Sequence, residues 1–260
     1  MGRQMSWQIF VHSVRQVFGN MQGALRVSAV LTIVQIIVTL TLGRAMLMDP
    51  VAMQTQMMDG SFSWPLHALA MVLLLLLGLW IAVGWHRYVL TNEQPAFVPR
   101  LHLDRVMGYF GKSILIGLLV VPLALLCVVV VGFALGPLFQ GQIMAQPVLA
   151  GAIFALLVYV PVGTVVMRLS AALPGVALEP GVSVFTGWRA TAGHTGTILG
   201  VVVISVVGSL LLSVPALTLF TPFSLPALIW QFATQWVQVM VGVSILTTLY
   251  GHYVEGRPLV

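Results

Sequence analysis

Residues 113–136 read SILIGLLVVPLALLCVVVVGFALG, 24 residues in a row without a charged side chain. A helix of about 20 residues crosses the hydrocarbon core of a bilayer. In lipid, backbone polar groups have no water to bond, so a spanning segment must be a helix or part of a closed barrel. Because this run is continuously apolar rather than alternating, it predicts a transmembrane helix.

The rest of the chain has the same character. Of its 260 residues, 59% are hydrophobic and 7% are charged, and the mean hydropathy is +1.04. Soluble domains carry roughly 25% charged residues, so this composition cannot build a water-facing surface. We therefore expect an all-α, polytopic membrane protein that forms a single domain over residues 1–260.

Six apolar segments are long enough to span a bilayer. We expect these spans at about 22–47, 65–90, 109–136, 147–173, 194–220 and 226–251. The first is too long for the apolar region of a cleavable signal peptide, so it is expected to remain as a span. Before it, residues 6–20 place apolar side chains on one helical face, which predicts an interfacial helix. These side chains are Trp7, Phe10, Val11, Val14 and Phe18.

The basic residues indicate the orientation. Ten of the eleven Lys and Arg residues flank the spans on one side, whereas Arg44 falls on the other, near Asp49 and Asp59. The positive-inside rule makes the basic side cytoplasmic, so both termini are expected there. Because the basic residues lie in short loops beside spans, the net charge of +5 does not indicate nucleic-acid binding.

The segments that lead into the odd-numbered spans resemble one another. In each, an arginine is followed by two glycines at short, similar spacings; the sets are Arg15, Gly19 and Gly23; Arg105, Gly108 and Gly111; and Arg189, Gly193 and Gly196. We interpret the chain as three repeated hairpins, each with a cytoplasmic interfacial helix followed by an outward and a returning span.

Polar side chains within the spans mark a candidate intramembrane site. Gln231, Thr234, Gln235 and Gln238 lie on one arc of the last span, and Gln35 in the first span is a candidate partner. Amides are costly against lipid, so this arc should face the bundle or a wet cavity. Its role is either interhelical hydrogen bonding or contact with a substrate or lipid headgroup.

Small residues predict close helix packing at the start of the fifth span. Ala192, Gly196 and Gly200 recur every four residues, and Gly208 continues the row after Ile204 interrupts it. Such a row lets a neighbouring backbone approach closely. The neighbour is either another part of this chain or a second protomer.

Basic residues near span ends are candidate contacts for anionic lipid headgroups. They are Arg87, Arg105, Lys112, Arg168 and Arg189. Alternatively, Arg168 and Arg189 form structural ion pairs with Glu179.

Patterns that carry catalysis or metal binding are missing from the sequence. No carboxylate lies mid-span, and no H-E-x-x-H, G-x-S-x-G or Walker-type motif occurs. The single cysteine, Cys127, lies in an apolar run and can form neither an internal disulfide nor a thiolate cluster. We expect no catalytic residues, no metal and no cofactor.

The most distinctive stretch is MRLSAALPGVALE at residues 167–179, followed by GWRAT at 187–191. It resembles a pattern in uncharacterised bacterial inner-membrane proteins that are similar to the membrane domain of glycerophosphoryl diester phosphodiesterases. The resemblance implies a bacterial inner-membrane location. Since 260 residues leave no length for the phosphodiesterase catalytic domain, it implies shared architecture and not enzymatic activity.

These observations lead to two hypotheses. The first is a non-enzymatic, lipid-interacting scaffold or accessory subunit whose partners are membrane lipids with anionic headgroups at the cytoplasmic face, other proteins or copies of itself. The alternative is a transporter or lipid-handling permease with its site near Gln231, Gln235 and Gln238. A cavity that is lined by these amides and open to one side would favour the alternative, whereas a dry, fully packed bundle would favour the scaffold.

Overall fold

The computed structural model describes residues 2–43, 47, 50–95, 98–139, 147–222 and 224–259. Within these ranges the chain is helical and has no strand, which confirms the all-α expectation. The helices are α1 (Gly2–Phe18), α2 (Met21–Thr41), α3 (Pro50–Met58), α4 (Trp64–Thr91), α5 (Leu103–Phe139), α6 (Pro147–Ser170), α7 (Leu173–Leu178), α8 (Val184–Ala190), α9 (Thr195–Thr218) and α10 (Leu225–Tyr253).

Six helical segments are long and apolar enough to cross a membrane, as the sequence predicted. They are Met21–Thr41, Trp64–Thr91, Leu103–Ala134, Leu156–Leu178, Thr195–Ala216 and Leu225–Tyr253. The predicted limits of the second, fifth and sixth spans agree with α4, α9 and α10 to within about two residues.

The predicted limits of the first, third and fourth spans differ from the structure. For the fourth, predicted at 147–173, helix α6 ends at Ser170, and the segment that is apolar enough to span runs over Leu156–Leu178. Helix α2 ends at Thr41 rather than at 47, and Arg44 and Asp49 lie outside the described residues. Helix α5 begins at Leu103 rather than at 109 because the charged residues of its first turn are compatible with a helix that starts outside the hydrocarbon. Its 37 residues make it about 55 Å long, which exceeds the ~30 Å hydrocarbon core.

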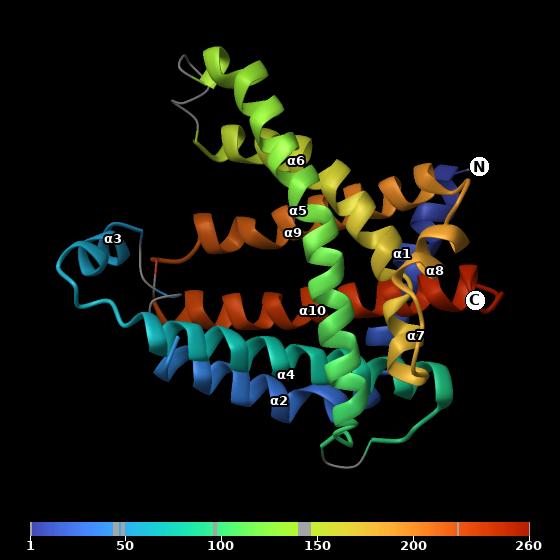
Figure 1. Ribbon diagram of the computed structural model, residues 1–260. Helices are drawn as coiled ribbons and strands as arrows, with labels where there is room; N and C mark the ends of the chain where they lie inside the picture. Colours follow the sequence, from blue (N-terminus) through green and yellow to red (C-terminus); the bar gives the residue numbers. More distant parts are fainter. Residues whose placement is uncertain are drawn as a thin grey trace.

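Helices α2, α4 and α10 run side by side with α9 beyond them, and α5 crosses in front at a steep angle (Figure 1). Helix α2 packs along α4, and α5 packs along α6. Helix α9 contacts α6 and α1 much more extensively than it contacts its hairpin partner α10. The last hairpin is therefore splayed, and this separation creates the cavities described below.

The N-terminal helix α1 packs on α9 and α10 through a face that the sequence analysis did not identify. Its buried row is Ser6, Ile9, Ser13 and Val17. Ser6 Oγ donates a hydrogen bond to the carbonyl oxygen of Thr197 (2.9 Å), and Ser13 Oγ donates one to Thr248 Oγ1 (2.9 Å). The large residues Trp7 and Phe18 of the predicted apolar face stay exposed, where an interfacial helix would present them to lipid.

The predicted repeat is present only in part. Helix α1 precedes α2 and helix α8 precedes α9, as expected for interfacial helices. Among the described residues between Thr91 and Leu103, however, no separate helix precedes α5. The segment expected to form this interfacial helix is instead the first part of α5, which runs without a break from Leu103 into the span.

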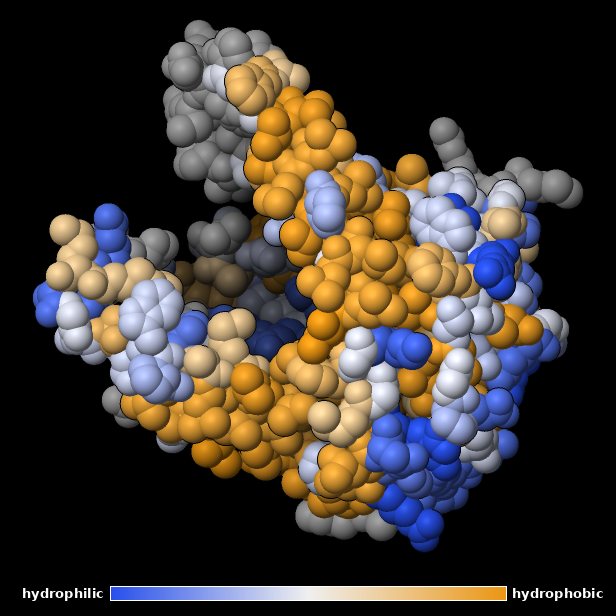
Figure 2. Space-filling view, in the orientation of Figure 1, coloured by the Kyte–Doolittle hydropathy of each residue, from blue (hydrophilic) through white to orange (hydrophobic). Residues whose placement is uncertain are grey.

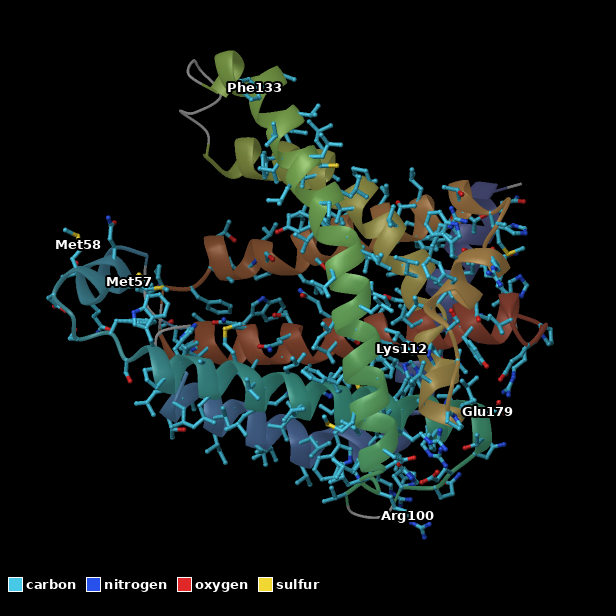
Figure 3. The ribbon with its side chains drawn as sticks, viewed as in Figure 1. Met57, Met58, Arg100, Lys112, Phe133 and Glu179 are labelled. Atoms are coloured by element: carbon cyan, nitrogen blue, oxygen red, sulfur yellow. The ribbon has the colours of Figure 1, made fainter. Side chains whose placement is uncertain are left out.

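Charged and apolar surfaces are segregated along the molecule. Hydrophobic residues cover α4 and the α5–α6 hairpin, whereas hydrophilic residues gather at the end that carries α7, α8 and the two chain termini (Figure 2). Arg100 and Glu179 lie towards this basic end, and Met57 and Met58 of α3 lie at the opposite end (Figure 3).

Candidate functional site: a groove between α9 and α10

The hairpin of α9 and α10 opens into a groove near the end of the bundle opposite the basic end. Helix α10 begins after Ser224, whose Oγ accepts a hydrogen bond from the amide of Ala227 (3.4 Å), with Pro226 in the first turn. One helical turn further on, Trp230 Nε1 donates a hydrogen bond to the carbonyl oxygen of Leu212 in α9 (2.9 Å). This bond bridges α9 and α10 at one wall of the groove.

The mouth of the groove is a cavity of about 410 Å³ with a polar lining. Gln231, Thr234, Gln235 and Gln238 face it from α10, and Ser213 faces it from α9. The structure thus brings three of the four predicted intramembrane glutamines to one cavity. Gln231 and Gln235 are four residues apart on α10, and Gln235 and Gln238 are three apart. These spacings place the three side chains on one helical face.

The side-chain amides of these three glutamines have no partner within the part of the chain that the structure describes. Gln231, Gln235 and Gln238 are exposed at the groove, and no side-chain amide of the three takes part in a hydrogen bond there. Thr234, by contrast, donates its hydroxyl to the carbonyl oxygen of Trp230 (2.9 Å). The interhelical bonding that the sequence left open is therefore not seen for these amides, and their donors and acceptors are available to a ligand.

Beside the mouth, and sharing Ser213 and Gln238 with it, lies a larger, open and mainly apolar cavity of about 780 Å³ between α4, α6, α9 and α10, here called the chamber. Tyr159 and Gly163 of α6, Val202 and Val206 of α9, and Val243 of α10 are among the residues that line it. The space-filling view is hollowed between α4 and the α5–α6 hairpin, and hydrophilic residues are visible on the floor of the hollow (Figure 2).

A row of serines on α9 lines the mouth and the chamber, and sequence analysis missed it. Ser205, Ser209 and Ser213 recur every four residues and all face the chamber. Ser205 and Ser213 donate their hydroxyls to the carbonyl oxygens of Val201 (2.8 Å) and Ser209 (2.9 Å) in the preceding turns, which leaves the hydroxyl oxygens able to accept. Their helical spacing was a signal available in the sequence.

Gln238 lies where three cavities of the site meet. It lines the mouth, the chamber and a third cavity of about 320 Å³ on the side of α9 and α10 that faces α1. Gly208, a predicted packing residue, lines this third cavity.

Gln35 lies apart from that groove. Its Nε2 donates a hydrogen bond to the carbonyl oxygen of Leu74 in α4 (3.3 Å). It shares a small pocket of about 20 Å³ with Gln235, lined also by Ser28 and Trp236. Trp236 Nε1 donates to Ser28 Oγ (2.8 Å) across this pocket, so Gln35 belongs to the packed contact among α2, α4 and α10.

Only one of the predicted small residues makes a close helix contact. A Cβ on Gly200 would lie 2.8 Å from Ser6 Cβ of α1, whereas one on Gly196 or Gly208 would have no neighbour within 4 Å. Ala192 is exposed. The close neighbour of α9 is therefore α1, a part of the same chain.

Arg168 is held inside the protein at the basic end. Its side chain is buried, and Nε, Nη1 and Nη2 donate to Thr191 Oγ1 (3.1 Å), Thr195 Oγ1 (3.2 Å) and the carbonyl oxygen of Trp188 (3.0 Å). The guanidinium also lies 3.7 Å from the centre of the Trp188 ring. These contacts tie α6 to α8 and α9.

The alternative ion pairs with Glu179 do not form within the described residues. Arg168 is engaged as above, and Glu179 and Arg189 are both exposed without an ion-pair partner there. Lys112, which is half-buried, likewise has no ion pair in that part of the chain. Arg189 and Lys112 therefore keep charges that can face anionic headgroups.

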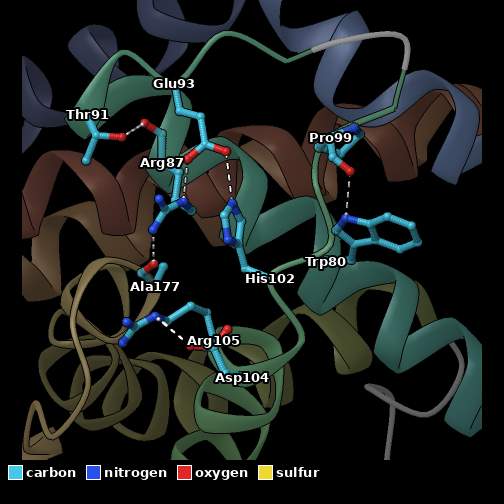
Figure 4. A network of polar contacts seen from close by, with 9 residues as sticks. All are labelled: Trp80, Arg87, Thr91, Glu93, Pro99, His102, Asp104, Arg105 and Ala177. Atoms are coloured by element: carbon cyan, nitrogen blue, oxygen red, sulfur yellow. Dashed lines mark hydrogen bonds and ion pairs between the residues drawn. The ribbon is translucent and has the colours of Figure 1, made fainter.

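Arg87 is bound to the loop that follows α4 (Figure 4). Its Nε lies 2.6 Å from Glu93 Oε2, and its Nη1 donates to the carbonyl oxygen of Ala177 (3.1 Å). His102 Nε2 lies 2.9 Å from Glu93 Oε1. Burial raises the pKa of the Glu93 carboxyl, but the hydrogen bonds from His102 and Arg87 outweigh this and leave its pKa below the usual value.

Arg105 forms an ion pair with its sequence neighbour Asp104, with 3.1 Å between Nε and Oδ2 (Figure 4). Asp104 is exposed, so this pair remains in contact with solvent. Such pairs contribute little stability, and Arg105 stays a candidate for the basic surface.

His86 occupies a position that the sequence analysis did not single out. It is fully buried, and its Nδ1 and Nε2 lie 2.8 Å from Thr247 Oγ1 and 3.2 Å from the Tyr109 hydroxyl. The buried residues Leu79, Ala82, Val83 and Leu90 flank it at helical spacing on α4, so the periodicity of α4 could have placed it in the core.

Within the described residues, no three His, Cys, Asp or Glu side chains come together as metal ligands. Comparisons of the chain with protein-family models, with curated proteins and with solved structures give no match.

Proposed function

We propose that this chain is a lipid-handling membrane protein that takes an amphiphilic lipid into the groove between α9 and α10. The observation that carries this proposal is the pairing of a polar mouth with an apolar chamber. Unpartnered amides of Gln231, Gln235 and Gln238 line the mouth, and a mainly apolar chamber follows directly. Ligand sites combine apolar walls with a few polar groups in this way.

The amides suit an uncharged, hydroxyl-rich headgroup. Each glutamine offers two donors and one acceptor, and none of the described residues that line the mouth or the chamber is charged. With the basic end cytoplasmic, as the positive-inside rule favours, the mouth opens towards the leaflet on the far side of the membrane. The half-buried Lys112 and the exposed Arg189 would meanwhile hold anionic lipid at the cytoplasmic surface.

The test is a lipid titration of the purified protein in mild detergent, followed by native mass spectrometry. A galactosyl diacylglycerol serves as the probe because its headgroup is uncharged and carries several hydroxyls. The triple variant Gln231→Leu, Gln235→Leu, Gln238→Leu should bind it about twentyfold more weakly, since each lost bond inside a membrane protein contributes roughly 0.6 kcal/mol.

The matched control is Gln22→Leu, a change of an exposed glutamine near the basic end of α2. It should leave binding unchanged. The triple variant should fold normally because none of the three side chains bonds to the described protein. Wild-type affinity in a well-folded triple variant would refute the proposal.

The scaffold hypothesis keeps one observation in its favour. The outer half of α5 is uncovered: Leu118, Leu125 and Phe133 are 67%, 62% and 83% exposed, and Phe133 lies near the tip of the α5–α6 hairpin (Figure 3). Either lipid or a partner protein can cover such a face. A protein that purifies in mild detergent without any other protein or lipid would exclude the scaffold.

A further inference from the structure

A second apolar groove lies on the opposite face of the α9–α10 pair, between these helices and α1. Phe10, Val14 and Phe18 of α1 line it together with Leu212 of α9 and Val241 of α10, and its volume is about 320 Å³. It lies against the membrane-spanning parts of α9 and α10. In that environment, hydrocarbon is the material available to fill an apolar groove.

The chamber and this second groove meet between the two helices. Ser205, Ser209, Gln238 and Gly242 line both cavities. Three of these residues are small, and a Cβ on Gly242 would have no neighbour within 4 Å. Small residues thus keep the gap between α9 and α10 open at this level.

We propose that the ligand has two hydrocarbon chains, one in the chamber and one in the α1-side groove, with Gln238 at the point where they diverge. This inference rests on the proposed function. In a diacyl lipid, ester carbonyls lie beside the branch point, and the Gln238 side-chain amide can donate a hydrogen bond to such an oxygen. A lipid with one chain would fill only one of the two cavities.

The experiment compares the galactosyl diacylglycerol with its single-chain lyso form in the same titration. Gly208 lines the α1-side groove and neither the mouth nor the chamber, so Gly208→Leu fills that groove alone. It should weaken binding of the two-chain lipid about fourfold or more, which corresponds to losing the burial of a single methylene group. Binding of the lyso form should not change.

Gly196→Leu is the control, because Gly196 lies on the same helix, has equally open space around its Cβ and lines none of these three cavities. Val14→Trp fills the same groove from α1 and gives a second, independent variant. If Gly208→Leu and Val14→Trp affect both lipids equally, or neither, the two-chain inference fails. If the triple glutamine variant binds both lipids as the wild type does, the proposed function fails instead.

Discussion

His86 Nδ1 of α4 lies 2.8 Å from Thr247 Oγ1 of α10, and the opposite ring nitrogen reaches the Tyr109 hydroxyl of α5 at 3.2 Å. One buried imidazole therefore connects three spans that are far apart in sequence. Thr247 also donates to the carbonyl oxygen of Val243 (2.9 Å), which makes its oxygen an acceptor for a His86 Nδ1–H tautomer.

Replacing His86 with Ala should destabilise the bundle by about 2–4 kcal/mol, because it opens a cavity and removes the partner of the buried Tyr109 hydroxyl. The effect would be measured by heating each protein in detergent and recording the loss of the folded peak by size-exclusion chromatography. His194→Ala, at an exposed histidine, is the control and should change little. Equal effects of the two changes would contradict the central role of His86.

Gly200 should be sensitive to a single methyl group. Gly200→Ala places a Cβ against Ser6 Cβ of α1, so α1 must shift, at a cost of about 1–3 kcal/mol. The Cβ added by Gly196→Ala has no neighbour within 4 Å, so this change should stabilise the helix slightly, by up to ~1 kcal/mol. Thermal stability of the two variants should therefore move in opposite directions; movement in the same direction would mean that α1 does not dock on Gly200.

The cluster around Glu93 should make stability depend on pH at the acidic end. Because the pKa of Glu93 is lowered in the folded protein from its usual 4.5, its contribution is fully present above that value and is lost as the pH falls through the lowered pKa. The difference in melting temperature between wild type and Glu93→Gln should shrink over that range.

Glu179→Gln provides the comparison for this pH profile. Glu179 is exposed and makes no ion pair within the described residues, so the difference between wild type and this variant should stay close to zero at every pH. A Glu93→Gln difference that is equally flat would show that the ion pairs with Arg87 and His102 are not formed.

Arg168 and Arg189 should respond differently to lysine. Arg168→Lys removes the planar arrangement that serves three acceptors and stacks on Trp188, and it should cost about 1–3 kcal/mol of stability. Arg189→Lys retains an exposed charge and should leave the melting temperature unchanged. Similar losses for both would assign Arg189 an internal partner too.

The orientation can be tested with cysteine labelling in a Cys127→Ser background. Met58→Cys at the far end of the molecule is highly exposed, and Arg189→Cys lies at the basic end. With the basic end cytoplasmic, an impermeant maleimide should label Met58→Cys in intact cells and Arg189→Cys only after permeabilisation. The reverse pattern would invert the topology.

Much of the candidate site could be anticipated from α10 alone. The spacing of Gln231, Gln235 and Gln238 fixes their common face through the period of the helix, and their polarity excludes a lipid-facing position. Gln35 could not be assigned in the same way, because its partner is a backbone carbonyl of α4 that only packing brings near.

The sequence by itself determined the membrane class, the six spans and the basic end, because hydropathy, length and charge are local properties that need no knowledge of packing. Only the tertiary structure decided that α9 leaves α10 to pack on α1 and α6, that Arg168 is bound internally, and that His86 is buried. These outcomes depend on contacts between residues far apart in the chain, such as Ser6 with Thr197. The basic residues whose side chains the structure describes thus divide into groups bound within the protein, such as Arg168 and Arg87, and free surface charges, such as Arg189, and the groove lies towards the opposite end of the bundle.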